Sequence, residues 1–349
     1  MRKPFPTEDL DQVLERTTDV WSRFDRARLF VTGGTGFVGS WLLEVVQRAN
    51  RVGASRIETV VLSRDPDRAR AVAPHLFNAP GITLVKGDVT NFEADVGTID
   101  VCIHAATDVA DPDKTADALR IFDAGVIGTR RVLDLALRNG ASRFLLTSSG
   151  AVYGKQPPSL PKVPETFEGA PDSLDVSTAY GQGKRAAEWL TCAYARQHAL
   201  HVSIARIYAL IGPAIPLDGP FAAGNFVRDT LAGRQIALKG DGRPLRSYLY
   251  MADMCVWLLR MLDRGENGQA YNVGSEHAIS IAELARQIER ISGSAAPAAS
   301  GPAETSDDAP PRYVPDTSKA RHALDVDAFT PLEVALSKTI NWHRTAVIV

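Results

Sequence analysis

The chain has 349 residues, of which 45% are hydrophobic and 23% charged, and its formal net charge is -2. This length exceeds one ordinary domain and suits two that share a core, and the composition excludes a disordered or fibrous protein. The small net charge argues against nucleic acid or an anionic membrane as a partner, and no apolar run approaches the roughly 20 residues that span a bilayer.

An amphipathic helix is predicted near the N-terminus, over residues 7–24, with Thr7 as its N-cap. Its apolar side carries Leu10, Val13, Leu14 and Trp21. The residues before it carry charges where a secretory signal peptide needs its apolar stretch, which predicts a cytoplasmic location. We expect residues 1–27 to form a helical extension that packs against the rest of the protein.

From Arg28 onward, short apolar runs alternate with helical patterns. The predicted buried strands are residues 28–32, 59–63, 82–86, 101–105 and 143–148, and the clearest helical patterns between them are 37–49 and 114–139. Strands joined by helical crossovers imply a parallel sheet with helices on both faces. The sequence therefore predicts an α/β, doubly wound Rossmann domain over residues 28–208.

The regular alternation ends after residue 150. A smaller α+β substrate-binding domain is expected, mainly over residues 209–349, with part of the chain returning to the Rossmann domain. The elements predicted after residue 150 are a proline-rich loop (157–164), a long helix (176–198), a strand (201–208), a low-complexity surface loop (295–311) and a final helix (331–345).

The cysteines and histidines give no sign of a metal or a disulfide. Cys102, Cys192 and Cys255 lie far apart and in no CxxC pair, so we expect reduced, mostly buried thiols. The seven histidines show neither HxxxH nor HExxH spacing. No metal site is therefore expected.

A glycine-rich turn follows the first predicted strand directly. Gly33 allows a tight turn, Gly36 lets the backbone approach a pyrophosphate, and Gly39 lets the next helix pack closely on the strand. The N-terminus of that helix offers free N–H groups and the positive end of its dipole to phosphates. We expect a dinucleotide here, bound by Gly33, Thr35, Gly36, Phe37, Val38 and Gly39.

The end of the second strand distinguishes NAD from NADP. An acidic residue there binds the ribose 2′-hydroxyl, whereas an arginine accommodates a 2′-phosphate. Ser63 stands where the carboxylate is expected and Arg64 follows it, so the sequence favours NADP(H). The alternative is that Arg64 is a solvated surface residue and Asp65 serves NAD(H). Asp88, after the third strand, is either a partner of the adenine amino group or a turn residue.

Tyr180 and Lys184 lie four residues apart at the start of the helix at 176–198, so they share a face. An ammonium beside a tyrosine hydroxyl stabilises the phenolate, which lets the pair exchange a proton with a carbonyl or alcohol. Alone, this spacing is also that of an ordinary helix surface. Ser149 ends the fifth strand, at the sheet edge where ligands bind, and could donate a second hydrogen bond to the substrate oxygen.

With these residues, the chain resembles the extended short-chain dehydrogenases/reductases of the NAD-dependent epimerase/dehydratase family, which act mainly on nucleotide sugars. The resemblance runs from about Arg28 to Leu324. The matching segments are TGGTGFVG (32–39), GDV (87–89), HAA (104–106), SSGAVYG (148–154), YGQGK (180–184), IGP (211–213), RSYLYMAD (246–253), YNVGS (271–275) and RYVPDTSKA (312–320).

The resemblance implies roles for individual residues. Tyr180 would be the catalytic acid/base, Lys184 would lower its pKa and hold the nicotinamide ribose, and Ser149 would orient the substrate oxygen. Further cofactor contacts would come from Val89, Ala105 and Ala106. A nucleotide diphosphate would bind near Asn225, Arg246 and Arg312, since the planar guanidinium fork pairs with phosphate oxygens. The alternative for the two arginines is a surface or inter-domain ion pair.

The chain departs from the family at three places. Gly150 and Ala151 stand where 4,6-dehydratases carry an Asp-Glu pair, so no acid is available there for eliminating water, and decarboxylation that uses the family's glutamate is likewise disfavoured. Gly125 replaces an asparagine, which removes a structural or cofactor-side hydrogen bond. Ala209 also replaces an asparagine, which puts local detail near the nicotinamide or sugar in doubt.

Two chemistries need only Ser149, Tyr180, Lys184 and a hydride carrier. One is reduction of a 4-keto (6-deoxy) nucleotide sugar by NADPH, and the other is 4-epimerisation with retained NAD. Arg64 favours the reductase. A non-catalytic dinucleotide sensor is a further alternative, although it would not need these three side chains. The helices at 114–139 and 176–198 predict either a homodimer interface or burial within one subunit.

Overall fold

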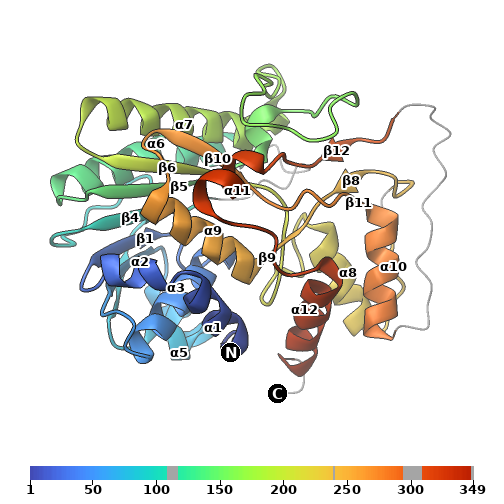
Figure 1. Ribbon diagram of the computed structural model, residues 1–349, viewed down its shortest axis with the longest axis horizontal. Helices are drawn as coiled ribbons and strands as arrows, with labels where there is room; N and C mark the ends of the chain where they lie inside the picture. The colour runs from blue at the N-terminus through green and yellow to red at the C-terminus, as the bar shows by residue number, and fades with distance from the viewer. Residues whose placement is uncertain (108–116, 239, 294–308, 347–349) are drawn as a thin grey trace.

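The computed structural model describes residues 1–107, 117–238, 240–293 and 309–346, and a seven-stranded sheet lies at its centre (Figure 1). The strand order is β10-β6-β5-β4-β1-β2-β3, and every adjacent pair is parallel. The strands are β1 (Arg28–Thr32), β2 (Glu58–Ser63), β3 (Ile82–Lys86), β4 (Val101–His104), β5 (Arg143–Ser149), β6 (His201–Ile207) and β10 (Gln269–Val273).

Helices cover both faces of this sheet, as the run of buried apolar residues in its strands requires. On one face lie α6 (Ala118–Arg138) and α7 (Ala179–Gln197), whose apolar sides form one core cluster with the strands. On the other lie α3 (Phe37–Arg51) and α9 (Met251–Arg264), within a second and larger cluster. The predicted doubly wound Rossmann architecture is thereby confirmed.

The N-terminal segment forms two helices instead of the single predicted one. α1 (Thr7–Arg16) and α2 (Thr18–Arg23) are separated at Thr17, and Pro6, not Thr7, occupies the N-cap of α1. Asp9 of α1 is fully buried, accepts a 2.6 Å hydrogen bond from the Tyr250 hydroxyl and pairs with Lys338. The segment therefore links Tyr250 to the C-terminal helix.

The chain after β6 builds a smaller unit and then returns to the sheet. The return consists of α9 and β10, which adds the seventh strand beside β6. The smaller unit contains the sheet β11-β8-β12 and the pair β7-β9. Its elements are β7 (Leu210–Ile211), α8 (Ala222–Leu231), β8 (Leu245–Arg246), β9 (Leu249–Tyr250), β11 (Ile279–Ser280), α10 (Ile281–Ser292), β12 (Arg312–Tyr313) and α12 (Leu332–Ala346).

Most predicted boundaries lie within a few residues of those observed. α6 begins at Ala118, and residues 114–116 of its predicted range lie outside the described residues, as does most of the low-complexity stretch at 295–311. The remaining helices are α4 (Pro66–Val72), α5 (Pro74–Phe77) and α11 (Ser318–Leu324). In the described parts of the chain, no helix is both long enough and apolar enough to cross a membrane.

Candidate active site

The glycine-rich turn after β1 adopts a conformation that side chains would prevent. Gly33 has φ +70°, and a Cβ on it would lie 2.4 Å from the Ala105 carbonyl group in the segment after β4. A Cβ on Gly39 would lie 2.3 Å from the Gly33 carbonyl oxygen. The first glycine therefore serves the turn and a close backbone approach, and the last lets α3 begin directly against the turn.

A cavity of about 800 Å³ lies along this turn and the carboxyl ends of the neighbouring strands. Eight of the residues predicted to bind cofactor line it: Gly33, Thr35, Gly36, Arg64, Asp88, Val89, Ala105 and Ala106. Phe37, Val38 and Gly39, at the start of α3, do not line it. A cleft beside a glycine turn at the strand ends fits a dinucleotide.

One wall of this cleft, formed by α6, was not predicted from the sequence. Four residues of α6 line it, namely Arg120, Asp123, Ala124 and Ile127. Their spacing of i, i+3, i+4 and i+7 is that of one helix face, which is a signal present in the sequence. Thr107, which follows the HAA segment, also lines the cleft.

At the end of β2, Ser63 and Arg64 line the cleft. Asp65 has another task, since its carboxylate accepts a 2.9 Å hydrogen bond from the Arg68 N–H and caps α4. Asp88 accepts from the Thr90 backbone and hydroxyl, and these bonds, helped by Arg64 and Arg120, hold its pKa below the usual value although partial burial opposes them. Arg64 is therefore the charged residue expected nearest the ribose 2′-position of the cofactor.

The predicted catalytic side chains meet at the end of β5. Ser149 is 7% exposed and Lys184 is 5% exposed. The Ser149 Oγ accepts a 3.2 Å hydrogen bond from the Ala151 N–H and is hydrogen-bonded to Tyr180. The Lys184 ammonium lies 5.8 Å from the centre of the Tyr180 ring and donates to the Thr147 carbonyl at 2.6 Å. The Ser149 hydroxyl and the Tyr180 phenol are thus bonded to each other, and the Lys184 ammonium lies near the phenol ring.

Burial sets the pKa values at this centre. It raises the pKa of Tyr180, and the hydrogen bonds with Ser149 and Thr107 only oppose that rise. The Lys184 ammonium, which is expected to lower that pKa, donates to the Thr147 carbonyl. Burial also lowers the pKa of Lys184 to about 8, despite the nearby Glu188 carboxylate. Tyr180 is therefore a protonated acid at neutral pH.

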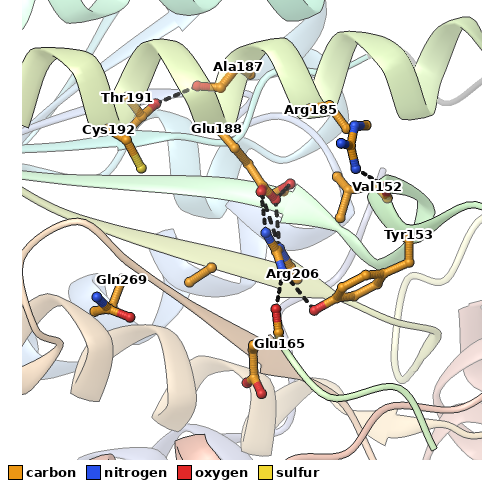
Figure 2. Close-up of polar contacts among 12 residues, drawn as sticks. Val152, Tyr153, Glu165, Arg185, Ala187, Glu188, Thr191, Cys192, Arg206 and Gln269 are labelled. Atoms are coloured by element: carbon orange, nitrogen blue, oxygen red, sulfur yellow. Dashed lines mark hydrogen bonds and ion pairs between the residues drawn. The ribbon is translucent and has the colours of Figure 1, made fainter. Parts of the chain in front are cut away.

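A buried ion pair fixes the catalytic helix to the sheet (Figure 2). Arg206 of β6 donates to both carboxylate oxygens of Glu188 on α7, at 2.7 and 3.0 Å, and to the Tyr153 hydroxyl at 2.8 Å. Glu188 also accepts a 2.5 Å hydrogen bond from Ser148, which precedes the catalytic serine. Removing one partner of such a pair costs about 3–5 kcal/mol. The pair therefore positions α7.

His104 at the end of β4 is another buried link. Its two ring nitrogens lie 2.7 Å from the Thr32 hydroxyl and 3.1 Å from the Thr129 hydroxyl. Burial, together with the charge of Lys184, lowers its pKa to about 3, so the ring is neutral. Thr32 in turn accepts from the Ala106 N–H at 3.1 Å. This series of hydrogen bonds joins the glycine turn, α6 and the segment that lines the cleft.

Gly125, which departs from the family pattern, has a packing role. A Cβ on it would lie 3.1 Å from the backbone of Gly183 on α7, so the two glycines let α6 and α7 approach closely. Its carbonyl accepts a 2.5 Å hydrogen bond from Thr129. At the third departure, Ala209, the backbone carbonyl accepts from the Leu249 N–H at 3.0 Å.

The space beside Gly150 is filled by two tyrosines. A Cβ there would lie 2.7 Å from both the Tyr208 ring and the Tyr313 hydroxyl, and the two rings are 4.5 Å apart between their centres. The glycine is therefore required by its neighbours. A carboxylate side chain at this position would meet both tyrosines.

Two of the three predicted diphosphate residues lie on neighbouring strands. Arg246 on β8 and Arg312 on β12 belong to paired strands, in which Arg312 lies opposite Leu245. The Arg312 Nε is buried and has no hydrogen-bond partner among the described residues. Asn225 is half-buried on α8, and within the described ranges its side chain makes no hydrogen bond to either arginine. The described residues also include no group of three or more candidate metal ligands.

The fold and the cleft define a Rossmann-type enzyme of the short-chain dehydrogenase/reductase class. The sequence model of the NAD dependent epimerase/dehydratase family matches residues 29–274. The chain therefore belongs to this family, as the motifs predicted.

The chain is similar to several characterised enzymes. It is 32% identical over 324 residues to UDP-glucuronic acid decarboxylase 1 of Xenopus tropicalis, covering 93% of this chain and 73% of that protein. Its fold matches UDP-glucose 4-epimerase of Thermotoga maritima, solved with UDP-glucose (TM-score 0.77, 21% identity, 92% and 99% coverage). It also matches MoeE5, solved with UDP-glucuronic acid and NAD (TM-score 0.74, 25% identity, 91% and 99% coverage).

Proposed function

We propose that the protein is an NADP(H)-dependent oxidoreductase that reduces a 4-keto (6-deoxy) nucleotide sugar. Two features of the site carry this proposal. Tyr180 is protonated and lies beside Ser149, and the next position, Gly150, can hold no acid. Reduction of a ketone needs a proton donor and no elimination catalyst. Family membership supports the enzyme class.

The residues of the cleft fit a dinucleotide. Gly33 and Gly36 line the cleft, where their backbone would meet a pyrophosphate, and Asp88, which also lines it, would accept from the adenine. Arg64 supports NADP(H), because the alternative carboxylate, Asp65, is engaged in capping α4. A bound nicotinamide would supply the hydride that reduces the carbonyl carbon.

The chain's own residues would transfer the proton and stabilise the developing charge. Ser149 would donate a hydrogen bond to the carbonyl oxygen, and Tyr180 would transfer its proton to that oxygen as it gains negative charge. Lys184 would then stabilise the phenolate, exchanging its bond with the Thr147 carbonyl for one toward the tyrosine. The raised pKa of Tyr180 keeps the phenol protonated before the reaction.

For the substrate, we propose that Arg246 and Arg312 bind the diphosphate of a nucleotide sugar. The buried Arg312 Nε lacks a partner among the described residues, and a buried guanidinium N–H without a partner is costly. A diphosphate would satisfy it. The related enzymes carry UDP-sugar names or ligands, which supports this substrate class.

Given NADPH and a 4-keto-6-deoxy nucleotide sugar, the protein should consume one equivalent of NADPH and form a single 4-hydroxy product. The measurement combines NADPH absorbance with product mass over a panel of GDP-, CDP-, UDP- and dTDP-sugars. Nucleotide hexoses should lose no water and UDP-glucuronic acid no carbon dioxide, because Gly150 and Ala151 supply no acid. Loss of either would overturn the proposal.

The alternative is a 4-epimerase with retained NAD. The same three side chains serve that chemistry, and MoeE5 was solved with NAD. Denaturing the purified protein and identifying the released dinucleotide separates the two. Retained NAD, together with epimerisation that uses no NADPH, would replace the reductase proposal.

Replacing Arg64 with alanine should lower NADPH affinity about ten- to a hundredfold and leave NADH affinity unchanged. A charge-assisted hydrogen bond is worth about 1.5–3 kcal/mol, and only NADPH has the 2′-phosphate. Fluorescence titration of both cofactors measures this. Arg70→Ala on α4, which removes the same charge from an exposed pair with Asp67, is the matched control. Equal losses for both cofactors would assign Arg64 another role.

A further inference from the structure

Tyr313 lies at the reaction centre although it comes from the C-terminal part of the chain. Its hydroxyl is 3.4 Å from the Ser149 Oγ. This is longer than an ordinary O–H···O bond, as bonds between catalytic groups often are before the substrate binds. Burial raises the pKa of Tyr313, so the phenol keeps its proton and can act as a donor.

The same strand carries one of the candidate diphosphate residues. β12 consists of Arg312 and Tyr313, and its pairing with β8 sets Tyr313 opposite Arg246. The Arg246 guanidinium lies 5.8 Å from the centre of the Tyr313 ring. In this register Arg246 and Tyr313 share one face of the strand pair, whereas Arg312 stands opposite Leu245.

The segment after this strand is firmly held. The Val314 N–H donates to the Gln156 side chain at 3.0 Å, Pro315 bridges to Val163, and the Asn272 amide donates to the Asp316 carbonyl at 2.9 Å. Tyr313 thus sits between a fixed anchor on one side and the two arginines on the other. A small movement of β8 and β12 would change the distance from its hydroxyl to Ser149.

The hydrogen-bonding capacity of Ser149 shows what that contact would do. A serine hydroxyl has two acceptor positions and one proton. The Ala151 N–H occupies one acceptor position. If Tyr313 donates to the other, the single Ser149 proton points to Tyr180, its present partner, or to a substrate oxygen that takes the place of that partner.

We propose that Tyr313 is a positioning residue that couples diphosphate binding at Arg246 to the orientation of the Ser149 hydroxyl. This inference rests on the proposed function for its substrate class. A diphosphate held by Arg246 would fix that guanidinium against the Tyr313 ring that it faces and hold the Tyr313 hydroxyl on Ser149. Binding of the nucleotide would then increase the rate of reduction at the sugar.

The test is Tyr313→Phe, which removes the hydroxyl and keeps the ring packed on Tyr208. We expect kcat for the nucleotide sugar to fall about three- to tenfold, the range for one neutral hydrogen bond, with KM, NADPH affinity and Tm unchanged. Tyr194→Phe is the control, since it removes a hydroxyl that donates to Asp134 on α6, outside the proposed machinery. A kcat equal to that of the wild type would overturn the inference.

A second measurement tests the coupling directly. Reduction of a free 4-keto-6-deoxy sugar by the wild type should speed up when the nucleoside diphosphate is added separately, and Tyr313→Phe should lose about three- to tenfold of that activation. Full activation in the variant would contradict coupling. If the wild type epimerises instead of reducing, the proposed function fails, and the kcat comparison is made on epimerisation, in which Ser149 serves the same oxygen.

Discussion

Tyr180→Phe should lower kcat by about 10² to 10⁴, the usual contribution of general acid–base catalysis, while NADPH affinity changes little. In the proposed mechanism the phenol is the proton donor, whereas the residues that line the cleft are spread over the glycine turn, the strand ends and one face of α6. Stopped-flow measurement of hydride transfer and fluorescence titration of NADPH give the two quantities separately.

The Tm of the Tyr180→Phe variant serves as the control. The hydroxyl bonds with Ser149 and Thr107 are lost, but the ring beside Lys184 stays, so the Tm should remain within a few degrees. Ser149→Ala should also slow the reaction, by less, because it removes a hydrogen bond and no proton donor. A Tyr180→Phe variant within a factor of a few of the wild type would remove this tyrosine from the mechanism.

Replacing both Arg246 and Arg312 with alanine should weaken nucleotide-sugar binding by about 10² to 10⁴, since each charge-assisted bond to phosphate is worth about 1.5–3 kcal/mol. Cofactor affinity should be unaffected, because neither arginine lines the cofactor cleft. Calorimetry with nucleoside diphosphates measures the loss, and the single variants show whether the two act independently.

Arg286→Ala provides the charge-matched control for this pair. Arg286 lies on α10 and is 63% exposed in an ion pair with Glu283, so its loss should leave nucleotide binding as it was. Unchanged affinity in the double variant would mean that the substrate lacks a diphosphate or binds elsewhere. A loss for cofactor and nucleotide sugar alike would instead indicate a structural role for the two strands.

Several features of the site could be predicted because their signals are local. The glycine turn is set by a backbone conformation and close approaches that only glycine permits, so Gly33 and Gly39 mark it in the sequence. Tyr180 and Lys184 share a helix face by their spacing alone. The raised pKa of Tyr180 has no such local signal, because it depends on burial and on the hydrogen bonds with Ser149 and Thr107.

The sequence by itself predicted the succession of strands and helices in the sheet domain, the glycine turn and the shared helix face of Tyr180 and Lys184, because each of these follows from residue type and short-range spacing. The missing acid at Gly150 was inferred from the resemblance to the family. Only the tertiary structure decided that Tyr313 stands beside Ser149, that α6 walls the cleft and that two tyrosines close the space at Gly150. These contacts join segments distant along the chain, and strand pairing and core packing bring them together only once the whole chain is folded.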